Sequence, residues 1–581
     1  MRWRLAGILT AILLVSHVAG STGAQPPIWV DAEAMSGWWG DSVNDVHIDS
    51  ESGDVYVVGA YRFDLHAGEL SLEANQHETG NTTDIFVGKW SDGDWAWLST
   101  AGGPDDDWGA AITIATDGSI YVAGGFKSNT SVFGSVSLNN TDQTPRTLTT
   151  SPTSEAFVGK LDPTTGSWTW AYAFQGQSSD WAVALEPAPS GGVYVVGNYA
   201  SDPIYDGGSS LMPGWADGGL TDSFLVEFDS TGAITSHSSL FDADSSLEVH
   251  SMALTTSGKV MVAGYFLGQA AYGVPNKTVN DAPGYSDGMI ASWDPSSNTW
   301  EWLASIGGQG SEEIYSIDAD ETGGAYVLSR TSSRLTYSID PDNSSRISNT
   351  NTGLTGTTDV MASRISGEGQ WQWTQSVSGA GNDDAHAIAS MSGGAVVLGG
   401  TASFQLAFDT HSVLKSDDPL NMDLWMAGIS DDGNWEWALG LGMAKWPETT
   451  SLHHSNGKTA MGGSFSTTHA EFGNLTIQNW DNESTYQWPD GFLATLDHSH
   501  RAGCTDENAP NFDASATIDD GTCQADGGNS PTDGTSNGSG QVDGEASGGG
   551  SILGMIFALL IIGLIGIIIL ASRNGDDSSN E

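Results

Sequence analysis

The sequence DVYVVGAY (54–61) decides the fold, because this apolar run with its glycine near the end returns along the chain. The later copies are SIYVAGGF (119–126), GVYVVGNY (192–199), KVMVAGYF (259–266), GAYVLSRT (324–331), GAVVLGGT (394–401) and KTAMGGSF (458–465). Each copy predicts a β-strand, since β-branched and aromatic residues dominate it. The copies recur at intervals of roughly 63 to 73 residues, which indicates an architecture of repeated units.

Two further lines of the repeat follow each copy. The second is an apolar strand, found as TDIFVGKW (83–90), SEAFVGKL (154–161), TDSFLVEF (221–228), SDGMIASW (286–293), TTDVMASR (357–364), MDLWMAGI (422–429) and PDGFLATL (489–496). The third is Trp-x-Trp, found as Trp95/Trp97, Trp168/Trp170, Trp300/Trp302, Trp371/Trp373 and Trp435/Trp437, with Ile234-Thr-Ser236 in its place once. The seventh unit lacks this third line, and an unpaired segment of that kind, IWVDAEAMSG (28–37), precedes the first unit.

Seven units, the last completed by the first strand of the chain, predict a closed ring. We therefore expect an all-β fold, a seven-bladed β-propeller of four-stranded antiparallel blades. First strands are expected at GAAITIAT (109–116), AVALEPA (182–188) and SMALTT (251–256), followed by tight turns rich in Gly, Asp and Ser. A long polar connection should join the second strand to the third. Radial repetition of such sheets removes long exposed edges.

The repeat resembles a β-propeller repeat family of secreted and surface proteins in bacteria and archaea. The matching segments are FGSVSL (133–138), FGNLTI (472–477), FVGKLDPTTGSWTWA (157–171) and FVGKWSDGDWAWL (86–98). The resemblance covers roughly residues 28–500. It implies the propeller fold and little about function, because propellers share a scaffold rather than a reaction.

Composition restricts the partners. The 581 residues include 72 acidic against 18 basic side chains, a formal net charge of −54. Nucleic acids and anionic membrane surfaces are bound by Lys and Arg, so this charge argues strongly against both as partners. An acidic surface suits a protein exposed to salty water, where screening limits self-repulsion.

Two apolar segments predict the compartment. MRWR followed by LAGILTAILLV (5–15) is typical of a secretory signal peptide, expected over residues 1–24. ILGMIFALLIIGLIGIIIL (552–570) is long enough to span a membrane, and we expect a transmembrane helix over 551–571. Arg573 beyond it favours a cytoplasmic tail at 572–581. The propeller (25–500) would then be an ectodomain at the cell membrane, outside the cell.

Between propeller and anchor lies GCTDENAPNFDASATIDDGTC (503–523), which holds the two cysteines of the chain. In an exported protein, Cys504 and Cys523 predict a disulfide that closes a small module at 501–524. This segment resembles a Cys-Thr-Asp…Asp-Asp-Gly-Thr-Cys module of marine microbial surface proteins. Its carboxylates offer oxygen ligands for Ca²⁺, although their spacing is not that of an EF-hand: Asp506, Asp513, Asp519 and Asp520. Residues 525–550, rich in Gly, Ser and Asp, predict a flexible linker.

Acidic residues recur just before the expected innermost strands and could ring the channel on the long-loop face. They are Asp106, Asp107, Asp180, Glu312, Glu313, Asp383, Asp384 and Glu448. Two interpretations stay open, hydrogen bonding to turn backbones or a cation or ligand site at the channel mouth. The adjacent aromatic residues Trp108 and Trp181 are candidates for ligand contact, as are Trp215, Trp446 and Trp480 in loops.

The Trp pairs are expected to share one face of the outer strand and to pack between blades rather than bind carbohydrate. Asn-x-Ser/Thr sequons, which would decorate the long-loop face if glycosylated, occur at Asn81, Asn129, Asn139, Asn276, Asn343, Asn474 and Asn482, with Asn537 in the linker. The chain leaves the ring on the tight-turn face, so we expect that face toward the membrane and the long loops outward.

The sequence favours a membrane-anchored extracellular module that binds a glycan or another surface protein, or that builds the envelope. The alternative is an exported polysaccharide hydrolase or lyase, with acidic residues at the channel mouth as acid and base. No catalytic motif supports the alternative: the thirteen histidines show no His-Glu-x-x-His spacing, and arginine is too scarce for a sialidase. No cofactor is indicated beyond the candidate Ca²⁺.

Overall fold

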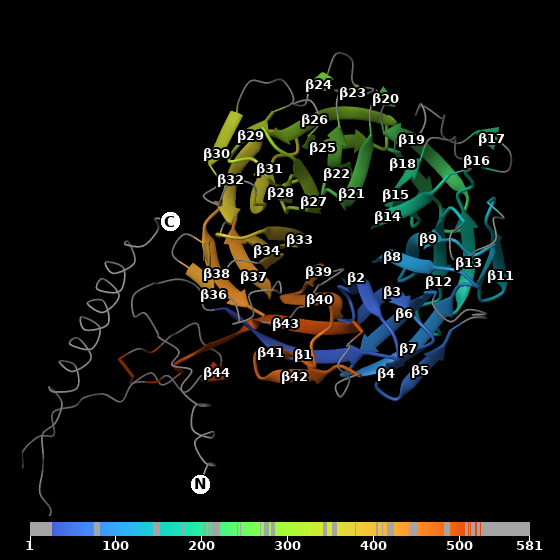
Figure 1. Cartoon of the computed structure of the whole chain (residues 1–581), viewed down its shortest axis with the longest axis horizontal. Helices are drawn as coiled ribbons and strands as arrows, with labels where there is room; N and C mark the ends of the chain where they lie inside the picture. Colours follow the sequence, from blue (N-terminus) through green and yellow to red (C-terminus); the bar gives the residue numbers. More distant parts are fainter. Residues whose placement is uncertain are drawn as a thin grey trace, which may run out of the picture. The chain divides into compact units, whose positions relative to one another are not determined.

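A computed structural model shows an all-β chain. It describes residues 26–523 with gaps at 75–81, 143–151, 177, 201–204, 207–208, 211–220, 241, 244–245, 268, 272–277, 281–284, 341–345, 351–356, 378, 402–404, 409–410, 415–422, 442–449, 481–487, 506–508, 511, 513–517 and 520–522. Within these residues the strands form seven four-stranded antiparallel blades arranged in a ring (Figure 1). The predicted seven-bladed propeller is confirmed.

The innermost strand of each blade lines the centre of the ring. These strands are β2 (Ser42–Ile48), β8 (Asp107–Ile114), β14 (Asp180–Pro187), β21 (Leu247–Leu254), β27 (Glu312–Ala319), β33 (Asp383–Met391) and β39 (Thr450–Ser455). They begin earlier than the sequence pattern predicts. Asp106 directly precedes β8, whereas the other acidic residues expected just before these strands lie at their beginnings: Asp107, Asp180, Glu312, Glu313, Asp383 and Asp384.

The second and third strands carry the two apolar lines of the repeat and are buried on both faces. The second strands are β3 (Val55–Tyr61), β9 (Ile120–Phe126), β15 (Val193–Ala200), β22 (Val260–Leu267), β28 (Ala325–Thr331), β34 (Gly394–Thr401) and β40 (Lys458–Phe465). The third strands are β6 (Asp84–Ser91), β12 (Glu155–Leu161), β18 (Thr221–Phe228), β25 (Ser286–Asp294), β31 (Asp359–Ile365), β37 (Asp423–Ser430) and β43 (Asp490–Gly503).

The outer strand of the seventh blade comes from the start of the chain. The outer strands are β7 (Asp94–Ala101), β13 (Trp168–Ala173), β19 (Ile234–Leu240), β26 (Thr299–Gly307), β32 (Trp371–Val377), β38 (Trp435–Gly440) and β1 (Pro27–Met35). β1 pairs antiparallel with β43, with Ala32 opposite Ala494 and Met35 opposite Gly491 (Figure 1). The predicted closure of the ring by the N-terminal strand is confirmed.

The expectation that the two Trp residues of a pair share one face is wrong. In β13 the residue between them is skipped by the register, since Trp170 lies opposite Lys160 and Trp168 opposite Leu161. This β-bulge breaks the period of two, so the indoles point to opposite faces. Trp168 packs with blade 1, and Trp170 packs with blade 3. The same register shift occurs in β7, β26, β32 and β38.

Each Trp pair therefore joins three blades. The second Trp donates its indole N–H to a carbonyl in the next blade, as Trp97 does to Pro163 (3.2 Å) and Trp302 to Gly367 (2.8 Å). The first reaches back to the preceding blade, as Trp168 does to the Thr100 carbonyl (3.1 Å). Seven hydrophobic clusters, one between each pair of neighbouring blades, result from this packing. The prediction that the Trp pairs serve packing rather than carbohydrate stacking agrees with this burial.

The connection from second to third strand contains a β-hairpin in every blade, which the sequence pattern did not reveal. The hairpins lie at the outer rim in Figure 1 and are β4 (Asp64–Ala67) with β5 (Leu70–Glu73), β10 (Thr130–Phe133) with β11 (Val136–Asn139), β16 (Tyr205–Asp206) with β17 (Ser209–Ser210), β23 (Gln269–Ala271) with β24 (Thr278–Asn280), β29 (Leu335–Ile339) with β30 (Arg346–Thr350), β35 (Gln405–Phe408) with β36 (His411–Leu414), and β41 (His469–Phe472) with β42 (Leu475–Gln478). β20 (Asp242–Ala243) pairs with β23.

These hairpins reach over to the preceding blade. β29 of blade 5 pairs with β26 of blade 4, and Val132 of blade 2 bridges Gly102 at the end of blade 1. The contact covers part of the outer edge that a blade would otherwise expose. Beyond the ring, β44 (Ile518–Asp519) pairs in parallel with the end of β43, and the predicted Cys504–Cys523 disulfide is present.

Candidate functional site

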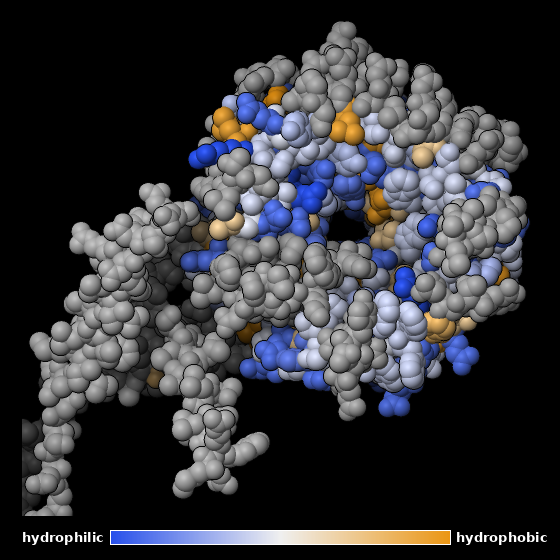
Figure 2. Space-filling view, in the orientation of Figure 1, coloured by the Kyte–Doolittle hydropathy of each residue, from blue (hydrophilic) through white to orange (hydrophobic). Residues whose placement is uncertain are grey.

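The innermost strands enclose a channel at the centre of the ring, visible as the dark opening in Figure 2. The cavity holds about 290 Å³ and is lined by residues of all seven inner strands. Its acidic and histidine side chains are Asp45, His47, Glu186, His250, Asp318, His386 and His453, and its lining includes no Lys or Arg. The lining is therefore polar and rich in groups that could become charged.

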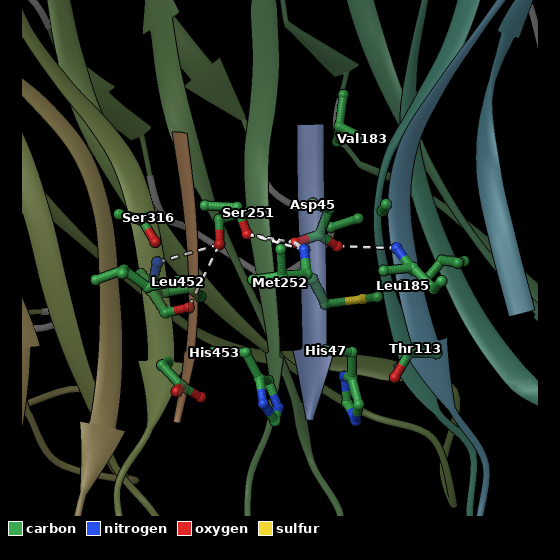
Figure 3. Close-up of a pocket in the computed structure, with 18 of the residues that line it drawn as sticks. Asp45, His47, Thr113, Val183, Leu185, Ser251, Met252, Ser316, Leu452 and His453 are labelled. Carbon is green, nitrogen blue, oxygen red and sulfur yellow. Dashed lines mark hydrogen bonds between the residues drawn. The ribbon is translucent and has the colours of Figure 1, made fainter. Parts of the chain in front are cut away.

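The channel carboxylates accept hydrogen bonds from neighbouring blades. Asp45 on β2 accepts from the hydroxyl of Ser451 (2.6 Å) in blade 7 and from the N–H of Ile112 (2.8 Å) in blade 2 (Figure 3). Asp318 on β27 accepts from the N–H of Ser390 (2.8 Å) in blade 6. Burial raises the pKa of both Asp45 and Asp318 to about 6. These carboxylates accept hydrogen bonds from backbone N–H groups at the edges of the inner strands, so their role is structural.

Serines beside Asp45 in the channel wall also accept hydrogen bonds from backbone N–H groups of neighbouring blades. Ser251 accepts from the N–H of Ile317 (3.1 Å), and Ser316 accepts from the N–H of Ile388 (3.2 Å). Together with the two aspartates they form a belt of side-chain to backbone bonds around the channel. Glu186 faces the same space, and burial raises its pKa well above the usual value, with Asp318 and Asp45 adding to the rise.

Two half-buried histidines meet where the last blade joins the first. The rings of His47 on β2 and His453 on β39 lie 3.9 Å apart, centroid to centroid (Figure 3). The N–H of Ile48 donates to Nδ1 of His453 (3.1 Å), so that nitrogen carries no proton. Burial lowers the pKa of His47 to about 4. Burial and the neighbouring His47 and His454 hold the pKa of His453 well below its usual value. Both imidazoles are therefore neutral near pH 7.

The structure places the acidic candidates away from open solvent. Asp107, Asp180 and Glu312 are at most 1% exposed. Asp107 accepts from the N–H groups of Lys127 (3.0 Å) and Ser128 (3.1 Å) and from two serine hydroxyls, and Glu312 accepts from the hydroxyl of Thr331 (2.8 Å). Burial and the nearby Asp84 raise the pKa of Asp107 to about 7. Asp107 thus holds the connection that follows β9, and Glu312 holds the last residue of β28.

Asp384 differs from those three acids because it is partly exposed and paired with a cation. Arg330 contacts Asp384 of blade 6 (3.1 Å) and Glu313 of blade 5 (2.9 Å), and its guanidinium lies over the ring of Tyr315, which lines the channel. This ion-pair bridge joins blades 5 and 6. Asp106 accepts from the N–H of Thr83 (3.3 Å), and Glu448 lies outside the described residues.

The aromatic candidates separate into two groups. Trp108 and Trp181 are the second residues of β8 and β14 and are half-buried. Trp480 is 48% exposed, on the turn after β42. Trp215 and Trp446 lie outside the described residues, as do Asp506, Asp513 and Asp520, while Asp519 is in β44. Among the candidates that the structure describes, neither the aromatic nor the acidic residues come together as one site.

An aromatic surface that the sequence analysis did not anticipate lies at the closure, between blades 7 and 1. We call it the closure aromatic cluster; it comprises Trp38, Trp39, Phe63, His66, Trp480 and Trp488. The rings of His66 and Trp480 stack in parallel at 4.9 Å, and those of Trp39 and Trp488 lie 4.6 Å apart. Trp38 is 65% exposed and donates its backbone N–H to Asp64 (3.3 Å). Asp64 also contacts Nε2 of His66 (3.0 Å).

The backbone within this cluster is strained. Phe63 has φ = 63°, the left-handed region that a bulky aromatic residue rarely adopts. Its ring lies 5.7 Å from that of Trp39. The consecutive Trp38 and Trp39, directly after the closing strand, were the signal in the sequence that could have identified this surface.

Three of the sequons lie on described, exposed positions. Asn129, Asn139 and Asn474 are on or beside the hairpins β10–β11 and β41–β42. The other sequons, Asn81, Asn276, Asn343, Asn482 and Asn537, lie outside the described residues.

Comparison with known proteins finds only distant structural similarity. No family model matches the chain, and no curated protein matches it. Among solved structures the chain is similar to polysaccharide lyase Uly1 (9% identity, TM-score 0.39, 78% of this chain and 90% of that one). It is also similar to the endosialidase of phage phi92 (9% identity, TM-score 0.33, 89% and 76%) and to an acylaminoacyl peptidase from Pyrococcus horikoshii (12% identity, TM-score 0.36, 76% and 53%).

The described residues contain no helix that is both long and apolar enough to cross a membrane. The segment 551–571, where the sequence predicts the anchor, lies outside them.

Proposed function

We propose that the protein is a membrane-anchored extracellular module that binds neutral glycans through the closure aromatic cluster. The observation that carries this proposal is the exposure of Trp38 and Trp480 on an otherwise strongly acidic protein. Large exposed aromatic side chains grouped on one surface are a feature of binding sites. Indole rings offer flat apolar faces for the C–H faces of sugar rings, and the Asp64 carboxylate beside them can accept hydrogen bonds from hydroxyls.

The geometry of the cluster supports a prepared site. Trp480 is held by the stacked ring of His66 and by the bond from its N–H to Asp490 (2.6 Å). The strained Phe63 is of the kind that occurs where a binding surface requires an unusual backbone. Fixed aromatic rings lose little conformational freedom when a ligand binds, which favours affinity.

The charge of the protein narrows the ligand class. With 72 acidic against 18 basic residues, the surface repels polyanionic chains such as uronates or sialylated glycans. Neutral polysaccharide or neutral oligosaccharide is therefore the expected ligand. Asp107 is buried, and Asp107, Asp45 and Asp318 all accept hydrogen bonds from backbone N–H groups. These bonds speak against their use as a catalytic acid and base, which favours binding over hydrolysis.

The anchor at 551–571 and the signal peptide at 1–24 belong to the same proposal. In a four-stranded blade the third strand ends on the tight-turn face, so β43 delivers the chain toward the linker from that face. The hairpins and the closure aromatic cluster lie at the opposite ends of the strands. Such an arrangement would present the cluster away from the membrane.

The test is binding of the full-length chain in mild detergent to an array of neutral and anionic glycans. The double variant Trp38→Ala/Trp480→Ala should lose affinity by about 30-fold or more, because buried Trp contacts commonly carry at least about 2 kcal/mol. Tyr285→Ala is the matched control, since Tyr285 is 47% exposed and lies outside the cluster. Unchanged binding by the double variant, or a preference for anionic glycans, would contradict the proposal.

A further inference from the structure

A carboxylate within the closure aromatic cluster is linked to both of its exposed tryptophans. Asp64 opens β4, and its Oδ1 accepts the backbone N–H of Trp38 (3.3 Å). Its other oxygen, Oδ2, contacts Nε2 of His66 (3.0 Å), and the His66 ring stacks on Trp480. The Asp64 side chain is 25% exposed, so solvent reaches it. A ligand that lies on the indoles is therefore beside this carboxylate.

The backbone fixes Asp64 against the segment that carries Trp38. A β carbon on Gly37 would clash with the carbonyl oxygen of Asp64, so only glycine permits this close approach. Ser36 and His66 exchange two backbone hydrogen bonds (3.0 and 2.8 Å) beside it. The position of the carboxylate relative to Trp38 is thus set before any ligand binds.

Acidic groups outnumber basic ones around the cluster. Asp41 is 2% exposed, and Asp490, which accepts the N–H of Trp480 (2.6 Å), is 1% exposed. Burial raises the pKa of Asp41 well above its usual value, and the charges of Asp490 and Asp64 raise it further. Arg62 lowers it, and is the one cation among the groups that act on Asp41. Even with Asp41 neutral, the carboxylates of Asp64 and Asp490 outnumber this guanidinium.

We propose that the closure aromatic cluster recognises a protonated amine on its glycan, so that amino sugars bind more tightly than their neutral N-acetylated counterparts. An ammonium group has three N–H donors, and its hydrogen bonds to a carboxylate such as Asp64 are about twice as strong as those between neutral groups. The exposed rings of Trp38 and Trp480 add cation–π attraction. The inference rests on the proposed glycan binding and names the chemical group that this site selects.

The experiment compares three β-1,4-linked tetrasaccharides at pH 6 and physiological ionic strength. Chitotetraose carries free amines that are largely protonated at this pH, tetra-N-acetylchitotetraose is neutral, and cellotetraose has hydroxyl groups in place of the nitrogens. Putrescine, a diamine without sugar rings, separates recognition of the amine from recognition of the glycan. Isothermal titration calorimetry of the full-length chain in mild detergent measures each affinity.

The wild type should bind chitotetraose at least about tenfold more tightly than either neutral tetrasaccharide, which corresponds to about 1.4 kcal/mol. Putrescine should bind more weakly than chitotetraose, because it lacks rings to lie on the indoles. Added NaCl should reduce the preference, since salt screens charges that are open to solvent.

Variants assign the preference to Asp64. Asp64→Asn should lower it to about twofold or less, whereas Asp64→Glu, which keeps the charge, should retain part of it. The matched control is Asp92→Asn, which removes one acidic group from an exposed turn outside the cluster, where φ is 53°, a conformation that Asn tolerates. This control should keep the full preference. The double variant Trp38→Ala/Trp480→Ala should lose binding of chitotetraose.

Four results would overturn the inference. Equal affinities for the charged and neutral tetrasaccharides would remove the amine preference and leave glycan binding at the cluster intact. Chitotetraose binding that survives in Trp38→Ala/Trp480→Ala would show attraction by the overall negative charge alone. Putrescine binding as tight as that of chitotetraose would show a site for amines rather than glycans. Binding of none of the tetrasaccharides would also refute the inference, whereas the glycan array decides the proposed function separately. If Asp64→Asn fails to fold, the wild-type affinities and the double variant still give one of these results or the expected one.

Discussion

The junction between blades 7 and 1 and the junction between blades 1 and 2 are built from equivalent residues and differ in what they present. The connection 36–41 at the closure corresponds to 102–107, because Ser36 bridges His66 as Gly102 bridges Val132. Both connections end in a buried aspartate, Asp41 or Asp107. Between these fixed points the closure has Trp38 and Trp39, where the other junction has Pro104 and Asp105.

The channel side of the two junctions differs as well. At the closure His453 accepts from the N–H of Ile48, and its ring lies tilted against that of His47. At the next junction Asp45 accepts from Ile112, and Thr113 takes the place that His47 has in blade 1. Residues that support the ring are therefore alike at the two junctions. Residues that face solvent or the channel differ, and at the closure they are aromatic side chains. The comparison also provides matched substitutions within one molecule.

The largest expected effect is the loss of stability when a buried phenylalanine of a third strand is removed. Phe492 on β43 and Phe86 on β6 occupy equivalent places and are fully buried. Phe492→Ala and Phe86→Ala should each lower the free energy of unfolding by about 3–5 kcal/mol. Phe492→Ala should additionally release β1, whose strand pairing within the described residues is with β43 alone. Denaturant unfolding measures the first effect, and limited proteolysis near residue 30 measures the second; equal proteolysis in both variants would mean that closure is no weaker than any other junction.

The next effect concerns acid stability. A histidine whose folded pKa is about 4, below its usual 6.5, takes up a proton more readily when unfolded. The stability that neutral His47 contributes is therefore present above pH 6.5 and is lost as pH falls toward 4, by at most about 3 kcal/mol. His47→Thr, which copies the Thr113 of blade 2, should flatten this loss. Urea unfolding between pH 4 and 7 measures it.

The channel carboxylates should act in the opposite direction and supply the control. Asp318 has its pKa raised to about 6, so the folded state holds the proton more tightly than the unfolded state. Its contribution grows as pH falls from 6 toward 4 and is absent at neutral pH. Asp318→Asn should therefore make the protein more sensitive to acid than the wild type. If both variants followed the wild-type curve, these groups would not control the pH dependence.

The smallest expected effect on stability is that of Trp38→Ala, the substitution that should affect glycan binding most. Trp38→Ala removes a side chain that is 65% exposed, so the free energy of unfolding should change by less than about 0.5 kcal/mol. Glycan binding by this variant should fall nonetheless. Installing Trp in place of Pro104 tests the converse, since the junction between blades 1 and 2 lacks the Trp480 and Trp488 partners and should remain inactive. A gain of binding there would show that one exposed indole is enough.

The ring could be predicted from sequence because its signals are local and repeated seven times. Strand patterns such as DVYVVGAY and the unpaired segment at 28–37 led directly to the closure by β1. The hairpins escaped notice because strands of four residues carry little pattern, although FGSVSL and FGNLTI alternate as strands do. The faces of the Trp pairs could not be read, because a single bulge reverses every side chain beyond it.

The candidate site could not be predicted from the sequence, for a different reason. The closure aromatic cluster is assembled from three segments, near residues 38, 63 and 480, that meet only when the ring closes. Acidic residues such as Asp107 were visible in the repeat, but whether they face solvent or a loop backbone depends on where the hairpin folds back. Burial of this kind is a tertiary property that residue type does not encode.

The pairing of β1 with β43 also sets a rule for how the molecule is made. The strand synthesised first completes the blade synthesised last, so the polypeptide cannot reach its final form until nearly five hundred residues have emerged from the ribosome. A product truncated before β43 would leave the edges of β1 and β40 open and ready to pair with another chain. The ring can therefore close only in a chain that contains both β1 and β43, whereas independent modules in a row would fold without the last one.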